Sequence, residues 1–122
     1  MWIMMSDAFF SIVEKDCGPD ELLVRARRPG DIEKVFGRHV EVERDYSADY
    51  LFRAKIARSE VAEVLESEVD RVEYPNFKDS VRDKELHDAY MGVWTEMARV
   101  QHPGPYSKPR KNNNGGKKKE KK

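Results

Sequence analysis

Residues 50–57, YLFRAKIA, alternate between two kinds of side chain with a period of two. One set consists of Tyr50, Phe52, Ala54 and Ile56, and the other of Leu51, Arg53 and Lys55. Because successive side chains of a β-strand point to opposite faces of a sheet, this alternation predicts a strand with one apolar and one basic face.

Three further strands are predicted outward from this stretch. Residues 39–46, HVEVERDY, alternate and are joined to residues 50–57 by a short turn, which predicts a hairpin. Residues 8–15 and 22–28 predict a second hairpin, with the turn residues Gly18, Pro19 and Asp20 between them. The second of these strands places Leu22, Val24 and Ala26 on one face.

Helices are predicted in the remaining segments. A short helix should begin with Asp31 as N-cap and end at Gly37. Ser59 is predicted to cap a helix over residues 60–72, with an apolar stripe at helical spacing. A longer helix is predicted over about residues 79–101, with Tyr90, Trp94 and Met97 on its buried stripe.

The predicted order is β-β-α-β-β-α-α. It corresponds to an α+β fold with a four-stranded antiparallel sheet, built from two hairpins, and helices on one face. Residues 1–104 are expected to form a single domain, and residues 105–122 a disordered, Lys-rich tail.

Charge is unevenly distributed along the chain. The 122 residues contain 23 basic and 23 acidic side chains. Residues 108–122 hold eight Lys/Arg and one Glu, a net charge of +7, and residues 1–107 hold 15 basic and 22 acidic residues, a net charge of −7. The chain therefore reads as an acidic domain with a basic tail.

No apolar run is long enough to span a membrane, and the single cysteine, Cys17, excludes an intramolecular disulfide. A cytoplasmic location is the expectation, with no membrane association. The sequence does not fix the oligomeric state.

The segment YPNF, residues 74–77, separates the two C-terminal helical patterns. Pro75 disfavours helix at Tyr74, and Asn76 can cap the following helix. Tyr74 and Phe77 can bury aromatic area and fix the angle between the helices. A binding loop that includes Lys78 is the alternative interpretation.

The order MW, FFSIV, LLVRAR, ADYLFRAKI, YPNFK and VWTEMARVQ over residues 1–101 resembles a family of small uncharacterised proteins found in bacterial genomes and phages. The resemblance carries no known activity over to this chain. Its phage association implies small proteins that bind host machinery, including inhibitors of host defence systems.

The sequence contains no recognisable catalytic or metal-binding signature. The three histidines and Cys17 lack ligand spacing, and no nucleotide-binding or nucleophile motif is present. We therefore expect no enzymatic activity, no catalytic or metal-binding residues and no cofactor.

Two binding hypotheses remain. The first is a protein-binding module that acts on a host protein or complex. The second is a nucleic-acid-binding protein that uses a basic sheet face, with Phe9 as a candidate aromatic, and the Lys-rich tail. The candidate binding surface comprises Arg25, Arg27, Arg53, Lys55, Tyr74, Phe77 and Lys78.

Overall fold

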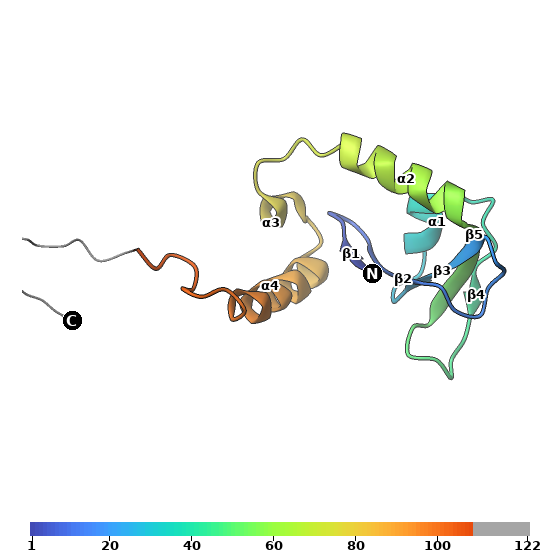
Figure 1. Ribbon diagram of the computed structural model, residues 1–122, viewed down its shortest axis with the longest axis horizontal. Coiled ribbons are helices and arrows are strands. Elements are labelled where there is room, and N and C mark those ends of the chain that lie inside the picture. The colour runs from blue at the N-terminus through green and yellow to red at the C-terminus, as the bar shows by residue number, and fades with distance from the viewer. Residues whose placement is uncertain (109–122) are drawn as a thin grey trace, which may run out of the picture. The chain divides into compact units, whose positions relative to one another are not determined.

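The computed structural model of the protein describes residues 1–108 (Figure 1). These residues belong to two compact units, one of Met1–Tyr90 and one that begins at Met91. The predicted basic tail begins at residue 105, and its residues 109–122 lie outside the described part of the chain.

A five-stranded antiparallel sheet organises the first unit. Its strands are β1 (Trp2–Met4), β2 (Phe9–Val13), β3 (Glu21–Ala26), β4 (Glu43–Arg44) and β5 (Phe52–Ala57). They lie in the order β1-β2-β3-β5-β4. The α+β class is confirmed, whereas the predicted four strands and element order are wrong.

Strand β1 is the added strand. Met1 exchanges two backbone hydrogen bonds with Ile12: its amino nitrogen donates to the Ile12 carbonyl at 2.9 Å, and the Ile12 nitrogen donates to the Met1 carbonyl at 2.8 Å. A tight connection closed by the Met5 N–H and the Ala8 carbonyl then returns the chain into β2. The alternation over residues 39–46 also overestimates a strand, because only Glu43–Arg44 pair with β5.

Helices α1 (Asp31–Phe36) and α2 (Arg58–Asp70) pack against β3 and β5 and against each other (Figure 1). Their apolar residues join one core cluster with the even-numbered side chains of three strands: Phe10, Ile12, Val24, Ala26, Ile32, Phe36, Phe52, Ala54, Ile56 and Val61. The period of two in the strand sequences therefore identifies the buried face correctly.

The N-termini of both helices differ from the prediction. Helix α1 is preceded by Gly30, whose φ of 86° is left-handed, and Asp31 is its first residue. Helix α2 follows Ala57 with no side-chain cap, so Ser59 lies inside the helix. The strand β5 runs directly into α2, which leaves no room for a separate capping turn.

The segment after α2 folds as two helices rather than one. Helix α3 (Phe77–Ser80) is followed by a break, and α4 (Lys84–Ala98) begins after it. The Asp83 carboxylate accepts the Leu86 N–H at 3.1 Å, which satisfies a free donor of the first turn of α4. Val81, Leu86 and Tyr90 form a second small core, with Phe9 and Phe77 against it.

The chain from Met91 onward contains the end of α4. Its apolar side chains are exposed: Val93, Trp94, Met97 and Val100. Trp94 is 48% exposed and Met97 61% exposed. The prediction of a buried stripe is therefore wrong for Trp94 and Met97, whereas Tyr90, earlier on the same helix, is buried.

Candidate functional site: a groove beside an edge strand

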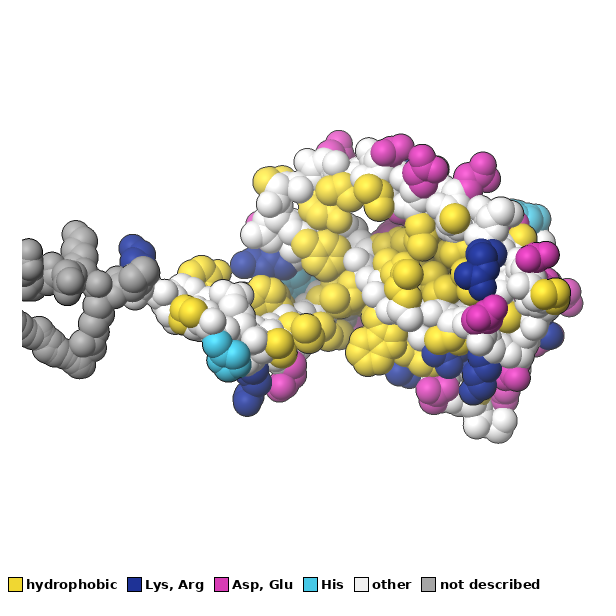
Figure 2. Space-filling view, viewed as in Figure 1, with side chains coloured by type: hydrophobic (Ala, Val, Ile, Leu, Met, Phe, Trp, Pro, Cys, Tyr) yellow, Lys and Arg dark blue, Asp and Glu magenta, His cyan; other side chains and the backbone are white. Residues whose placement is uncertain are grey.

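A groove of about 940 Å³ lies within the first unit. Three segments supply most of its lining: the chain from β1 into the following turn, the C-terminal half of α2, and the chain from residue 71 to residue 83. Arg28 and Lys34 complete it. Its apolar lining consists of Ile3, Met4, Met5, Leu65, Val69, Val72, Tyr74 and Pro75. Figure 2 shows hydrophobic side chains on this face and acidic side chains along the outer side of α2.

Helix α2 divides its apolar stripe between the core and the groove. Val61 is 2% exposed and Leu65 packs against the core. Val69, one turn after Leu65, and Val72, just after the end of the helix, are 70% and 52% exposed and line the groove. The stripe continues beyond the part of the helix that the sheet covers, so apolar surface remains uncovered there.

Strand β1 presents an unpaired backbone edge. In an antiparallel pair, residues that exchange both hydrogen bonds alternate with residues that exchange none. The pairing of Met1 with Ile12 and of Met5 with Ala8 places Ile3 in the bonded set and turns the N–H and C=O groups of Trp2 and Met4 away from β2. Since β1 is the last strand of the sheet, these groups have no strand partner among residues 1–108.

The YPNF segment forms part of the groove wall. The Asn76 side chain accepts the N–H groups of Lys78 and Asp79 at 3.0 and 3.4 Å, so the predicted N-cap is confirmed. Tyr74 lines the groove, and its ring centroid lies 5.9 Å from that of Phe77. The segment can therefore connect two helices as a hinge and also form part of the groove wall.

Phe77 and Lys78 lie outside the groove lining. The Phe77 ring stacks at 5.4 Å on the Tyr90 ring in the second core, and Lys78 is exposed on α3. Phe77 and Lys78 therefore do not contribute to the groove surface as Tyr74 does, although all three are close in sequence.

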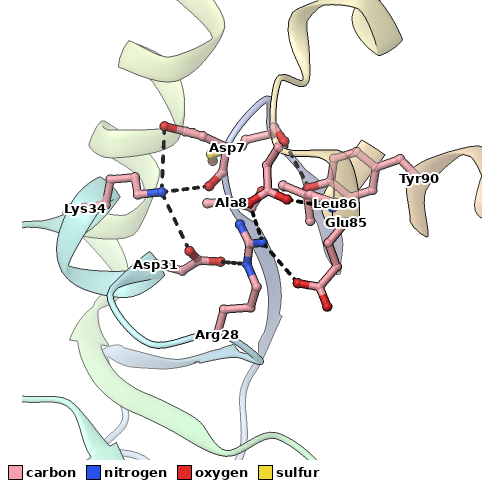
Figure 3. A network of polar contacts seen from close by, with 10 residues as sticks. Asp7, Ala8, Arg28, Asp31, Lys34, Glu85, Leu86 and Tyr90 are labelled. Carbon is pink, nitrogen blue, oxygen red and sulfur yellow. Dashed lines mark hydrogen bonds and ion pairs between the residues drawn. The ribbon is translucent and has the colours of Figure 1, made fainter. Parts of the chain in front are cut away.

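A network of charged side chains borders the groove (Figure 3). The Arg28 guanidinium donates to Asp83 at 2.9 Å and lies 4.0 Å from Asp31. Lys34 lies 3.8 Å from Asp31 and donates to the Asp7 carbonyl at 2.9 Å. Helix α1, the β1–β2 turn and the start of α4 are joined by these contacts.

The two carboxylates of this network are shifted in opposite directions. Burial raises the pKa of Asp31, against the opposing charge of Arg28. The hydrogen bond from the Leu86 backbone, followed by that from Arg28, lowers the pKa of Asp83. Each shift implies a different dependence of stability on pH.

We expect Asp31 to titrate above its ordinary pKa of 3.8 and Asp83 below it. The contribution of Asp31 to stability is complete below the unfolded pKa and is lost as pH rises through the folded value. That of Asp83 is present above the unfolded pKa and is lost as pH falls through the folded value. Side-chain carboxyl NMR titration measures both.

Arg28→Gln tests whether the charge of Arg28 contributes to the pKa values of Asp31 and Asp83. Removal of the guanidinium charge should raise both carboxyl pKa values. An Asp31 that titrates below 3.8, or carboxyls that do not respond to the substitution, would contradict the network.

The four predicted cations of the sheet lie together on the face opposite the helices. Arg25 pairs in register with Arg53, and Lys55 pairs with Leu23 in the next row. Arg27 follows β3 and lies with its Cζ 4.0 Å from the centroid of the Tyr50 ring. None of the four lines the groove, so the predicted surface divides into two separate regions.

Within residues 1–108, no group of three or more His, Cys, Asp or Glu side chains is arranged to hold a metal ion. The Cys17 thiol donates to the Glu21 carbonyl at 3.3 Å. No helix in this range is both long and apolar enough to cross a membrane.

Sequence reasoning missed the groove itself and two of its components. Strand β1 was not expected, and Val69 and Val72 were assigned to the buried stripe of their helix. The length of the stripe gave no signal, because Val61 to Val72 spans about 17 Å at helical rise and a six-residue strand spans about 20 Å.

Comparisons of the chain with protein families, with curated proteins and with solved structures find no match.

Proposed function

We propose that the chain is a non-enzymatic protein-binding module whose groove takes an extended segment of a partner protein. The observation that carries the proposal is the coincidence of an open strand edge with uncovered apolar side chains on the same groove. Addition of a strand to a sheet edge draws affinity from backbone hydrogen bonds and specificity from side-chain pockets.

The backbone contribution comes from Trp2 and Met4. Their outward N–H and C=O groups are spaced as one strand needs to pair with another. The side-chain contribution comes from Val69, Val72 and Tyr74, against which alternate residues of the incoming strand would be buried. The groove, at about 940 Å³, is large enough for several side chains.

Charge favours an apolar, near-neutral segment. Arg28 and Lys34 are engaged by Asp31 and Asp83, and Arg71 is paired with Glu68 at 2.9 Å. Glu73, Asp79 and Arg82 also line the groove and form no ion pair within residues 1–108, but their charges sum to only −1, so the groove has no strong preference for a highly charged ligand.

The resemblance to phage and bacterial proteins supports a narrower form of the proposal. In that form the partner is a protein or complex of a host, and binding inhibits it, as an inhibitor of host defence would. The groove supplies the contact surface in either form.

The experiment compares the proteins that the immobilised full chain and its variants capture from an extract with and without nuclease treatment. Met4→Pro removes the outward N–H of β1 without removing a β1–β2 ladder bond. Val69→Asp combined with Val72→Asp places charge on the uncovered stripe. We expect both variants to lose the proteins that the parent retains.

Ala62→Asp is the matched control, because Ala62 is exposed on α2 and does not line the groove. It should capture the same proteins as the parent. If the Val69/Val72 variant retains them too, the groove is not the binding site; if nuclease removes them all, protein binding is not the function.

A further inference from the structure

The outward face of the sheet carries cations without carboxylate partners. No Asp or Glu oxygen among residues 1–108 lies within ion-pair distance of Arg25, Arg27, Arg53 or Lys55. The nearest strand neighbour of opposite sign is Glu43, in register with Arg53. Asp45 also acts on Arg53, but one of its oxygens is engaged by Ser47 at 2.7 and 3.0 Å.

Two of these guanidinium groups are held in place by Tyr50. The Arg25 Cζ lies 4.7 Å and the Arg27 Cζ 4.0 Å from the centroid of its ring, which is 4% exposed. Arg25 also donates to the Ser11 hydroxyl at 2.7 Å. Ordering these flexible side chains in advance lowers the entropy cost of binding an anion.

The arrangement is not explained by stability alone. The Nε atoms of Arg25 and Arg53 are shielded from solvent and have no hydrogen-bond partner among the described residues. A buried donor without an acceptor is unfavourable. An apolar side chain would cover this face without that penalty.

An exposed aromatic side chain completes the face. Trp2 is 72% exposed and pairs in register with Ser11, which pairs with Arg25. At a strand spacing of about 4.8 Å, Trp2 lies about 10 Å across the sheet from Arg25 and about 14 Å from Arg53. The ring centroids of Trp2 and Phe9 lie 6.3 Å apart in an edge-to-face arrangement. This packing restricts the indole on the sheet surface.

We infer that this face binds single-stranded nucleic acid, with a base stacked on Trp2 and phosphates held by Arg25, Arg27, Arg53 and Lys55. Sheets that combine exposed aromatic rings with basic side chains bind unpaired strands in this way. The side chains of this site do not line the groove, and the proposed groove partner would meet Trp2 only at its backbone edge. Residues 1–107 are acidic overall, so the attraction is local to this face.

The test measures fluorescence anisotropy of labelled 15-nucleotide dT and U oligonucleotides, and of a duplex of equal length, with the full chain. Trp2→Ala should weaken single-strand binding by at least about 5-fold, the lower end of the effect of losing one stacked base. Duplex binding should stay unchanged, because paired bases are not free to stack on Trp2. A dU oligonucleotide, which shares its base with U and lacks the 2′-hydroxyl, shows which sugar the face accepts.

Arg27→Ala combined with Lys55→Ala should reduce the slope of log affinity against log salt by about 1.4, at about 0.7 for each phosphate contact. Arg38→Ala combined with Lys78→Ala is the matched control: both residues are exposed and it removes the same charge. It should leave that slope at the parent value. The Lys-rich tail is present in every protein and contributes equally to all of them.

Equal slopes for the two double variants, or equal loss of single-strand and duplex binding in Trp2→Ala, would overturn the inference. The Val69/Val72 variant should bind oligonucleotides as the parent does. That result separates failure of this inference from failure of the proposed groove function. Circular dichroism of each variant confirms that the fold is retained.

Discussion

Replacement of Phe10 by alanine is expected to lower the free energy of unfolding by about 3–5 kcal/mol. The Phe10 side chain is 0% exposed at the centre of the main core and meets the Phe36 ring edge-on at 5.3 Å. Its removal leaves a cavity that the close-packed neighbours fill only in part. Since small domains are stable by only about 5–15 kcal/mol, chemical denaturation should show a large shift of the midpoint.

Trp94→Ala is the matched control, because it truncates an even larger aromatic side chain that is half exposed. Its expected cost is about 1 kcal/mol or less. Similar losses in the two variants would show that Trp94 belongs to a core, as its helical spacing alone predicts.

Tyr90→Phe is expected to cost about 1–3 kcal/mol. The Tyr90 hydroxyl lies 2.9 Å from the Met5 carbonyl oxygen and 3.0 Å from that of Ala8, and both contacts are buried. The Ala8 carbonyl keeps the Met5 N–H as a partner, whereas no other hydrogen bond of the described residues reaches the Met5 carbonyl. Phenylalanine therefore leaves a buried acceptor unsatisfied at almost unchanged volume.

Tyr46→Phe removes the same atom from an exposed site. Tyr46 is 77% exposed, and its hydroxyl accepts a long hydrogen bond of 3.4 Å from Arg44. The free energy of unfolding should therefore change by about 0.5 kcal/mol or less. Thermal or chemical unfolding of the two variants beside the parent measures the difference. Equal stability of Tyr90→Phe and the parent would show that the hydroxyl does not secure the β1–β2 turn.

The strands that contribute most to the sheet could be predicted because their pattern and their burial have the same cause. Alternation in residues 52–57 reflects one polar and one buried face, and Phe52, Ala54 and Ile56 lie in the core. The prediction is wrong for Tyr50 and Leu51, which precede the strand: Leu51 packs against the core, and the Tyr50 ring lies against Arg25 and Arg27. Strand β1 has only three residues, too few for a period to be recognised. Its pairing depends on β2, which a local pattern does not describe.

Helical periodicity does not determine whether the apolar side of a helix is buried. It identifies the apolar side of a helix but not what covers that side. Val61 and Val69 share one stripe of α2, yet one is buried and the other is exposed in the groove. The groove depends on where the sheet ends beneath the helix, and this is a property of the tertiary structure.

The basic sheet residues were predicted from alternation alone, and Arg25 and Arg53 do lie in register. The position of Trp2 beside them could not be predicted, because it follows from the register of the unexpected strand β1.

The division of α2 has a consequence for how such a protein can evolve. Substitutions at Val61 and Leu65 are constrained by folding, because both side chains contact the core. Substitutions at Val69 and Val72 change an exposed surface and leave the core intact. Under the proposed function, a change of partner would require substitutions only at the end of α2 and just after it, while the scaffold stays the same. Related sequences should then diverge at positions 69 and 72 before they diverge at 61 and 65.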